Sequence, residues 1–382
     1  MKILMLNHEF PPVGGGASPV TLELAAQLVR MEHSVDVVTM HWGNLPRHER
    51  LHGIDVYRTW AIRKKADISY THELATYLPG ALFKTLSLVK RNRHDVIHCH
   101  FIVPGGPLAR VVGSLTRTPF LITCHGTDVP SHNPDRFVLM HRLISPAWRH
   151  IARTAGALVS PSAALRDSIL RHCPQANVKI IPNGIHVEAL APVEKARRIV
   201  MCSRMFAFKG FQYAIAAIRD LELDWQVDVI GEGPYLSELK RLAQGSKTPI
   251  TFWGWLGKED PQFRKLFREG AIFVFPSEAE NFPTVLLEAL AAGMAIVTSD
   301  AGGCPEVVGE AGILIKPKDT EAIRDSVLRL VQSSDERARL SQAALARVQQ
   351  FSWESIANRY VDCYREVIEA ARERKQGVEV AR

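Results

Sequence analysis

Two glutamates flank a predicted helix start in the second half of the chain and form the most distinctive chemical pattern. Glu280 lies in a polar loop after an apolar run, and Glu288 lies inside the helix that begins near Pro283. The free amide groups of Thr284 and Val285 at that helix start form an anion site. Carboxylates accept hydrogen bonds from sugar and ribose hydroxyls, so the pair could hold a sugar nucleotide on either side of its diphosphate. A capping glutamate and a surface glutamate are the plain alternative.

Arg204 and Lys209 follow the predicted strand Ile199–Ser203, in the segment SRMFAFKG. An arginine can bind phosphate through two parallel hydrogen bonds, and a lysine acts as a point charge. Two cations at the carboxyl end of a strand suit a departing diphosphate, which gains negative charge as its bond to a sugar breaks. Taken alone, two cations in a loop are more often plain surface charges.

Two glycine-bearing loops in the first half also follow predicted strands. In Pro11–Pro19, PPVGGGASP, the consecutive glycines Gly15 and Gly16 allow a backbone to approach phosphate closely before a helix starts. This loop lacks the GxGxxG pattern of dinucleotide-binding folds, and the GEGP turn at Gly231–Pro234 is likewise incomplete. In the second loop, TCHGTD, His125 is a candidate for a functional role, with a structural histidine as the alternative.

The patterns that resemble metal sites are weak. Asp220 and Glu222 resemble a DxD motif but precede a strand, where a solvated turn is expected. His98, Cys99 and His100 have the ligand types for zinc, but strand alternation points Cys99 away from both histidines, and no second ligand pair follows. We therefore expect neither a bound metal nor another cofactor.

Short apolar runs, separated by amphipathic helical patterns, are the elements that must position these residues. Such runs are typical of parallel sheets that are covered on both faces. The strands expected in the first half are Ile3–Leu6, Val35–Thr39, Val96–His98, Phe120–Thr123, Ala157–Val159 and Lys179–Ile181. Those expected in the second half are Ile199–Ser203, Gln226–Ile230, Ile250–Trp253, Ile272–Phe275, Ala295–Thr298 and Gly312–Ile315.

This alternation predicts two doubly wound, Rossmann-like α/β domains. The alternation of strands and helices begins again near Arg198 after a turn-rich stretch, so we place the linker at residues 186–197. The expected domains cover residues 1–190 and 197–354, and a long amphipathic helix follows at residues 355–382. Ligands of open parallel sheets bind beyond the carboxyl ends of the strands, so we expect the site in a cleft between two facing domains.

Charge is distributed unevenly along the chain. Residues 1–190 contain 21 Lys and Arg against 13 Asp and Glu, whereas the remainder contains 26 against 27. The first half could therefore face an anionic membrane or a phosphate-bearing acceptor, or it could simply have a solvated basic surface. Nucleic acid is not expected, because no aromatic-interleaved basic motif is present. The stretch Leu78–Arg93 could rest on a bilayer, or it could pack as a helix with its basic residues outward.

Cysteine usage and hydropathy favour a cytoplasmic protein. The six cysteines are scattered without a CxxC pair, which is typical of reduced thiols. No run of about 18 apolar residues predicts a membrane span. The amino-terminal MKILMLNHEF is interpreted as a first strand and not as a signal peptide. Peripheral contact with the inner face of the cell membrane is the accompanying hypothesis.

In this order and spacing, the motifs resemble those of the retaining GT-B glycosyltransferases of family 4, the glycosyl transferases group 1. The resemblance covers essentially the whole chain and includes the GEGP and HGTD turns. Its other motifs are E-x7-E at Glu280–Glu288, R-x4-KG at Arg204–Gly210, PNG at Pro182–Gly184, GG-C-PE at Gly302–Glu306 and FSW at Phe351–Trp353. Asn281 and Pro283 stand where the family often has glycines, a departure that bears on sugar specificity more than on activity.

The resemblance implies a role for each candidate residue. Glu288 would hold the donor ribose, Glu280 would hold a hydroxyl of the donor sugar, and His125 would contact the transferred sugar near the reaction centre. Arg204 and Lys209 would bind the diphosphate. Further donor contacts would come from Gly15, Gly16, Asn281, Phe282, Thr284 and Val285, and from the Trp253–Leu256 loop, including Trp253 and Leu256, around the nucleobase. The final helix would cross back onto the first domain.

The implied reaction moves a hexosyl group, with retention of configuration, from a UDP- or GDP-sugar to a glycan or lipid-linked acceptor, as in surface polysaccharide or lipopolysaccharide biosynthesis. Glu280 and Glu288 flank the predicted diphosphate site, which argues against either one as a covalent nucleophile. We expect front-face substitution instead, with a diphosphate oxygen taking the acceptor's proton. A nucleotide-sugar epimerase and a non-catalytic sugar-nucleotide-binding protein are the alternatives. A nicotinamide oxidoreductase is disfavoured by the two incomplete glycine patterns.

Overall fold

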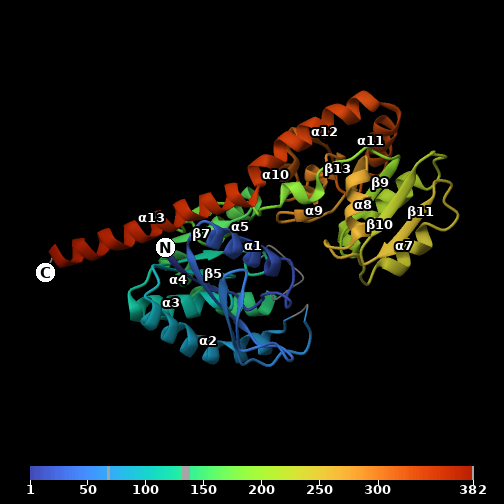
Figure 1. Ribbon diagram of the computed structural model, residues 1–382. Coiled ribbons are helices and arrows are strands. Elements are labelled where there is room, and N and C mark those ends of the chain that lie inside the picture. The colour runs from blue at the N-terminus through green and yellow to red at the C-terminus, as the bar shows by residue number, and fades with distance from the viewer. Residues whose placement is uncertain (67–68, 131–137, 381–382) are drawn as a thin grey trace. The chain divides into compact units, whose positions relative to one another are not determined.

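Two mainly parallel sheets, one in each of two units, organise the computed structural model of the chain (Figure 1). The structure describes residues 1–66, 69–130 and 138–380. The first unit comprises Met1–Asn183 and Trp353–Arg382, and the second comprises Gly184–Ser352. The division thus falls just ahead of the stretch 186–197 that the sequence marks as a linker.

The sheet of the first unit runs in the order β3-β4-β2-β1-β5-β6-β7-β8, and its strands are parallel apart from the β3–β4 pair. The strands are β1 (Lys2–Leu6), β2 (Ser34–Met40), β3 (His48–Leu51), β4 (Ile54–Thr59), β5 (Val96–His100), β6 (Phe120–Thr123), β7 (Ala157–Ser160) and β8 (Val178–Ile180). The six strands predicted in this half lie within two residues of these bounds, whereas the β3–β4 hairpin is not among them. The order reverses between β1 and β5, which is the switch point where ligands bind in such sheets.

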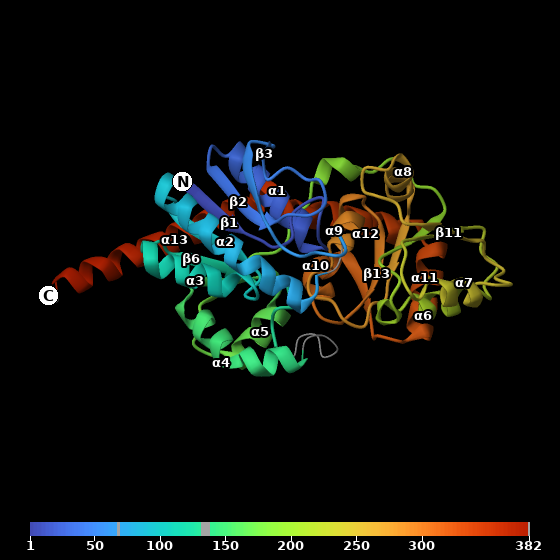
Figure 2. The ribbon, with the colours of Figure 1, turned by 90° about the horizontal axis from the view of Figure 1, so that it is seen from below.

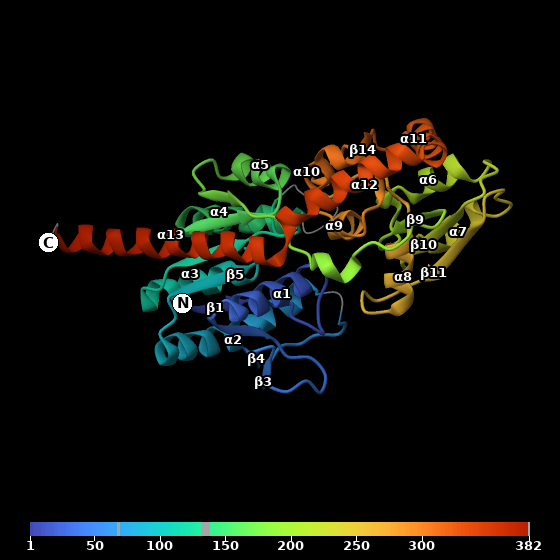
Figure 3. The same cartoon turned by 45° about the horizontal axis from the view of Figure 1, so that its top comes forward.

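Helices cover both faces of this sheet, as the doubly wound prediction requires. They are α1 (Ala17–Arg30), α2 (Thr71–Asn92), α3 (Gly105–Thr116), α4 (Val138–Thr154), α5 (Ala163–His172) and α13 (Trp353–Val380). Helices α2, α3, α4 and α5 pack on one face, where α2 and α3 lie side by side (Figure 2). Helices α1 and α13 pack together on the other face (Figure 3). The last helix of the chain therefore completes the core of the first unit.

The second unit contains a six-stranded, all-parallel sheet in the order β11-β10-β9-β12-β13-β14. Its strands are β9 (Arg198–Cys202), β10 (Gln226–Ile230), β11 (Ile250–Gly254), β12 (Ile272–Phe275), β13 (Ala295–Ser299) and β14 (Gly312–Ile315). All six predicted strands match within one residue. Counted from β9, this is the strand order of a Rossmann fold, with its switch point between β9 and β12. The prediction of two Rossmann-like units is confirmed.

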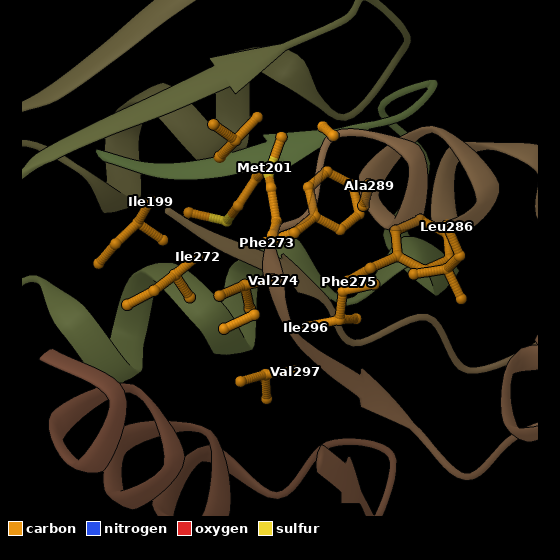
Figure 4. Close-up of a cluster of buried hydrophobic side chains, with 14 of the residues drawn as sticks. Ile199, Met201, Ile272, Phe273, Val274, Phe275, Leu286, Ala289, Ile296 and Val297 are labelled. Carbon is orange, nitrogen blue, oxygen red and sulfur yellow. The ribbon is translucent and has the colours of Figure 1, made fainter. Parts of the chain in front are cut away.

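The core of the second unit holds its central strands rigidly. Phe273 and Phe275 of β12 pack among Ile296 of β13 and Leu286 and Ala289 of the helix that follows (Figure 4). The helices are η1 (Val187–Leu190), η2 (Ala207–Lys209), α6 (Phe211–Ile218), α7 (Leu236–Leu242), α8 (Pro261–Glu269), α9 (Thr284–Ala291), α10 (Cys304–Val308), η3 (Gly309–Ala311), α11 (Thr320–Gln332), α12 (Ser334–Val348) and η4 (Gln349–Phe351). Because β12 is buried on both faces, its carboxyl end is a fixed platform for the loop that follows it.

None of the described helices is long and apolar enough to cross a membrane.

Candidate active site

The switch point of the second unit brings together a cation and a carboxylate that are far apart in the sequence. Lys209 follows β9, Glu280 follows β12, and the two side chains form an ion pair. Both side chains are nearly buried, with exposed fractions of 13% and 11%. The ammonium nitrogen of Lys209 also lies 5.0 Å from the centroid of the Phe208 ring and 5.6 Å from that of Phe275. The pair is thus partly shielded from water, which strengthens its electrostatic interactions.

The loops that hold this pair are tied together through their backbones. Gly210 has φ +75, and a Cβ atom there would overlap the carbonyl group of Pro276. The amide of Glu278 donates to the carbonyl oxygen of Phe208 at 2.7 Å. Only glycine permits so close an approach with this backbone conformation. The distance between the loop after β9 and the loop after β12 is therefore set by main-chain contacts.

Arg204 lies at the start of the same loop, exposed, with its guanidinium carbon 5.6 Å from the centroid of the Phe206 ring. The GEGP turn shapes this part of the loop. A Cβ atom at Gly231 would overlap the carbonyl oxygen of Ser203, and the amide of Met205 donates to the carbonyl oxygen of Glu232 at 2.8 Å. The incomplete glycine fingerprint noted in the sequence thus supports the Arg204 loop through close backbone packing.

The Glu280 segment is held by a second pair of glycines. Cβ atoms at Gly302 and Gly303 would overlap the carbonyl oxygens of Glu280 and Asn281, and the amide of Gly303 donates to the Glu280 carbonyl oxygen at 3.1 Å. Helix α9 begins three residues after Asn281, with Pro283 at its N-cap and no side-chain cap among the described residues. This arrangement presents the amino-terminal amides of α9 as an anion site close to the Glu280 loop.

Glu288 and Lys258 form the second lysine–glutamate ion pair of this region. Glu288 lies inside α9 with its side chain 7% exposed, whereas the side chain of Lys258 is 63% exposed. A buried carboxylate that keeps an exposed, flexible lysine as its partner can exchange that partner for another donor at little cost. Lys258 follows β11 and was not among the residues singled out in the sequence.

The predicted nucleobase loop and Phe282 are each anchored to the second unit by side-chain contacts. The indole nitrogen of Trp253 donates to Asp228 Oδ1 at 2.9 Å, and Asp228 is fully buried. Leu256 packs, half-buried, against the core of this unit. The buried ring of Phe282 lies 5.8 Å from the ring of Phe351. Phe282 therefore anchors the Glu280 loop through its buried ring.

In the first unit, His125 follows β6 in a turn that Asp128 organises. Asp128 Oδ1 accepts from the amides of His125 at 2.9 Å and Gly126 at 3.1 Å, and its Oδ2 accepts from the amide of Ile102 at 2.7 Å. Burial raises the pKa of the Asp128 carboxyl even though these amides favour its charged form. Burial, together with His8, lowers the pKa of His125 to about 3. We therefore expect His125 to be neutral at neutral pH.

The glycine-rich loop after β1 already has a carboxylate against its backbone. The amide of Gly15 donates to Glu9 Oε2 at 2.9 Å, and that of Gly14 donates to the carbonyl oxygen of Ala66 at 2.7 Å. Helix α1 starts with Gly16 at its N-cap. The loop thus binds an anionic group at the position predicted for phosphate, and Glu9 must move if a diphosphate is to reach Gly15.

The described residues contain no group of three or more His, Cys, Asp and Glu placed to hold a metal ion. In β5, His98 contacts α13 whereas Cys99 belongs to the core on the opposite face. The alternation predicted for His98, Cys99 and His100 is confirmed.

Comparisons with known proteins agree on one family. A family model described as Glycosyltransferase Family 4 matches residues 14–189, and one described as Glycosyl transferases group 1 matches residues 196–333. An uncharacterized glycosyltransferase of Methanocaldococcus jannaschii is 26% identical over 97% of this chain and 99% of its own length. The chain belongs to the family 4 glycosyltransferases.

Solved structures show that this family 4 glycosyltransferase has the GT-B fold. Sucrose-phosphate synthase from Thermosynechococcus elongatus superimposes with a TM-score of 0.79 at 21% identity, covering 97% of this chain and 100% of that one. HepE from Anabaena, in complex with UDP, superimposes with a TM-score of 0.76 at 18% identity, covering 95% and 99%. An enzyme of this family binds a sugar nucleotide and transfers its glycosyl group.

Each unit also has candidate residues that the sequence analysis did not select for the donor. Lys258 could have been found as a cation after a strand, by the rule that selected Arg204 and Lys209. Glu9 gave no such signal, and His100 was considered only as a zinc ligand, because the contacts of both side chains arise only in the fold.

Proposed function

We propose that this family 4 glycosyltransferase is a metal-independent, retaining hexosyltransferase that uses a UDP- or GDP-sugar. The observation that carries the proposal is the partly buried Lys209–Glu280 pair at the switch point of the second unit. Its lysine supplies positive charge for a departing diphosphate, and its carboxylate supplies an acceptor for a sugar hydroxyl. The UDP bound by the structural neighbour HepE supports a nucleoside diphosphate as the ligand.

The geometry of the second unit supports most of the remaining donor contacts that we propose. Arg204 joins Lys209 on the diphosphate, together with the amides of Thr284 and Val285 at the start of α9. Glu288 holds the ribose hydroxyls by exchanging Lys258 for them. The segment from Trp253 to Leu256 borders the nucleobase. In the first unit, Gly15 and Gly16 contact the diphosphate once Glu9 has moved, and His125 contacts the transferred sugar.

We infer that substitution occurs on one face of the sugar. The bond between the anomeric carbon and the diphosphate oxygen breaks, the acceptor oxygen bonds to the same face of that carbon, and the acceptor's proton passes to the diphosphate. Lys209 and Arg204 offset the charge that develops on the leaving group. Glu280 is neutralised by Lys209, and Glu288 is buried beside Lys258, so neither carboxylate is suited to act as a free nucleophile.

A panel of UDP-, GDP- and ADP-sugars, incubated with the enzyme and followed by mass spectrometry, tests this function. We expect metal-independent release of UDP or GDP from one donor, because the diphosphate subsite is made of side-chain cations and helix amides. An epimerase would convert the nucleotide sugar to an isomer of the same mass without releasing nucleotide, so the products are also separated by chromatography. Binding without turnover of any donor would instead indicate a sugar-nucleotide-binding protein.

Variants of the two cations test the mechanism. Arg204→Ala and Lys209→Ala should each lower kcat by at least about 100-fold, because each removes one donor from the leaving group. Lys247→Ala is the matched control, since Lys247 pairs with Glu222 on the surface of the same unit. Normal transfer rates in Arg204→Ala or Lys209→Ala would eliminate the proposed mechanism.

We propose a glycan or lipid-linked acceptor of cell-surface polysaccharide synthesis, with the enzyme on the inner, anionic face of the cell membrane. A groove of about 410 Å³ in the first unit supports this. It lies between the ends of α2 and α3 and helix α13, and its basic lining residues are Lys90, Arg93, Arg117, Arg372 and Lys375. Leu115 lines the same groove and is 67% exposed, so cations and apolar surface meet there as they do in lipid-binding surfaces.

Co-sedimentation with vesicles that contain phosphatidylglycerol tests the membrane proposal. The double variant Arg93→Glu, Arg117→Glu should bind at least about tenfold more weakly, because each basic residue near an anionic surface contributes about 1 kcal/mol. The control is Arg30→Glu, Arg50→Glu, which changes the net charge of the same unit equally, away from the groove. An equal loss of vesicle binding in both variants would refute docking through the groove. Sedimentation that does not depend on anionic lipid or on salt would also refute it.

A further inference from the structure

Two buried histidines of β5 take no part in the function proposed above. His98 and His100 are both fully buried, and their rings are tilted against each other with centroids 4.3 Å apart. His98 is fully bonded, with Nδ1 2.7 Å from the hydroxyl of Tyr364 and Nε2 2.8 Å from Thr123 Oγ1. His100 is different, because its Nδ1 lies 3.1 Å from Nε2 of His125. A buried histidine is therefore in direct contact with the candidate sugar-binding histidine.

The protonation states of these two rings are coupled. Burial lowers the pKa of His125 to about 3 and holds the pKa of His100 well below its usual value, so both rings are neutral. One neutral imidazole must then donate to the other. If His125 donated from Nε2, His100 would carry its own proton on Nε2. That atom is buried and has no hydrogen-bond partner among the described residues.

An unpaired buried N–H group is among the costliest defects in a protein interior, more so than an unpaired acceptor. The favoured arrangement places the proton of His100 on Nδ1, from which it donates to His125 Nε2. His125 must then carry its proton on Nδ1, the ring nitrogen that has no partner among the described residues.

The orientation of the His125 ring is also restrained by Phe101. This residue has φ +67, a left-handed conformation that is unfavourable for a bulky side chain. The conformation places its ring 4.5 Å from the centroid of His125 and 4.9 Å from that of His8. Backbone strain at such a position is typical of functional sites, where the surrounding packing maintains it.

We propose that His100 is a positioning residue that fixes the tautomer and ring orientation of His125, so that His125 presents Nδ1–H as a neutral hydrogen-bond donor to the transferred sugar. The contact with the sugar rests on the proposed function. The tautomer itself does not, because it follows from the buried hydrogen bond between the two rings.

Nitrogen-15 NMR of the full-length, histidine-labelled protein tests the tautomer without any substrate. The resonances of His125 are assigned by their loss in His125→Asn. We expect Nδ1-protonated His125 in the wild type, the same tautomer in His100→Asn, whose amide can donate to Nε2, and a mixture of tautomers in His100→Leu. Nε2-protonated His125 in the wild type, or an unchanged tautomer in His100→Leu, would overturn the proposal.

Transfer kinetics test the consequence for the reaction. His100→Leu should lower kcat by about tenfold, with the donor KM changed by less than about twofold, because an ill-positioned donor is lost mainly from the transition state. His100→Asn should recover most of that loss. Tyr364→Phe is the control, since it disturbs the neighbouring His98 and not His125, and should keep both the tautomer and kcat.

Failure of His100→Asn to recover activity while the tautomer is preserved would contradict the positioning role. Absence of glycosyl transfer in the wild type, with the expected tautomer present, would instead refute the proposed function.

Discussion

The two switch points of the molecule share the same strand topology but have different electrostatic environments. In the second unit, residues beyond β9, β11 and β12 are charged and paired, as in Lys209–Glu280 and Lys258–Glu288. In the first unit, residues of β5 and residues beyond β1 and β6 include histidines whose pKa values are lowered by burial. A nucleoside diphosphate needs charge, whereas a sugar needs hydrogen bonds from groups that do not repel a developing positive centre. One fold thus supplies either environment, because strand topology places the loops and only the loop residues set the charge.

The largest expected effect that follows from this contrast is selective acid sensitivity of the first unit. The pKa of His98 and that of His125 are lowered to about 3, and that of His8 to about 4, each chiefly by burial. Because these folded-state values lie below the unfolded value, stability is complete above about pH 6.5 and is lost as the pH falls. Between about pH 7 and about pH 5, protonation of His98 and His125 in the unfolded chain should lower the free energy of unfolding by at most about 4 kcal/mol.

Hydrogen exchange followed by mass spectrometry at both pH values measures this effect in each unit. The second unit contains only one of the fifteen histidines, His186, and serves as the internal control. Equal loss of protection in the two units at about pH 5 would show that the histidine cluster is not the cause.

The second prediction concerns how backbone packing holds the charged site. In Gly302→Ala, the added methyl group would overlap the carbonyl oxygen of Glu280 at a φ of +55, so the Glu280 loop must shift. We expect kcat/KM to fall by about 100-fold, because small displacements of catalytic groups are costly. Gly245→Ala has a φ of +72 but meets no atom within 4 Å, and should lose only about 1 kcal/mol of stability, with normal kinetics. If both variants behaved alike, backbone strain and not the overlap would explain the loss.

The sequence was sufficient to predict the elements whose residue types reflect their burial. Strands such as β12 are buried on both faces and therefore form continuous apolar runs, which single them out. The β3–β4 hairpin was missed because His48–Leu51 reads HERL, a polar edge strand, and because its turn at His52 and Gly53 uses left-handed residues of which only one is glycine.

The same distinction applies to the site. Arg204, Lys209 and Glu280 could be selected as candidates because each follows the carboxyl end of a buried strand, where parallel sheets bind ligands. The ion pair between Lys209 and Glu280, which are 71 residues apart, could not be predicted without knowing that β9 lies beside β12. The hydrogen bond between His100 and His125 could not be predicted from the sequence. Periodicity shows on which face of the sheet a side chain lies, but not which neighbouring side chain it contacts.

The third prediction separates the two roles within the Lys209–Glu280 pair. Glu280→Gln should slow transfer by about tenfold, since an amide is a weaker acceptor for a sugar hydroxyl than a carboxylate. Binding of UDP and GDP, measured by calorimetry, should be unchanged or tighter, because Lys209 no longer has a competing carboxylate. Glu222→Gln, which removes the partner of exposed Lys247, is the control. Weaker nucleotide binding in Glu280→Gln alone would place Glu280 in the diphosphate subsite.

The smallest expected effect tests whether α13 stabilises the buried histidines of the first unit. The hydroxyl of Tyr364 lies 2.7 Å from His98 Nδ1 inside the core, so Tyr364→Phe should lower the free energy of unfolding by about 1 kcal/mol, the usual cost of one buried hydrogen bond. Tyr213→Phe is the control, because the Tyr213 hydroxyl makes no hydrogen bond within the described residues. Urea unfolding followed at both units should show the Tyr364→Phe loss in the first unit. A loss confined to the second unit would mean that α13 does not stabilise the histidine cluster, and that β5 and β6 alone maintain the neutral environment of His125.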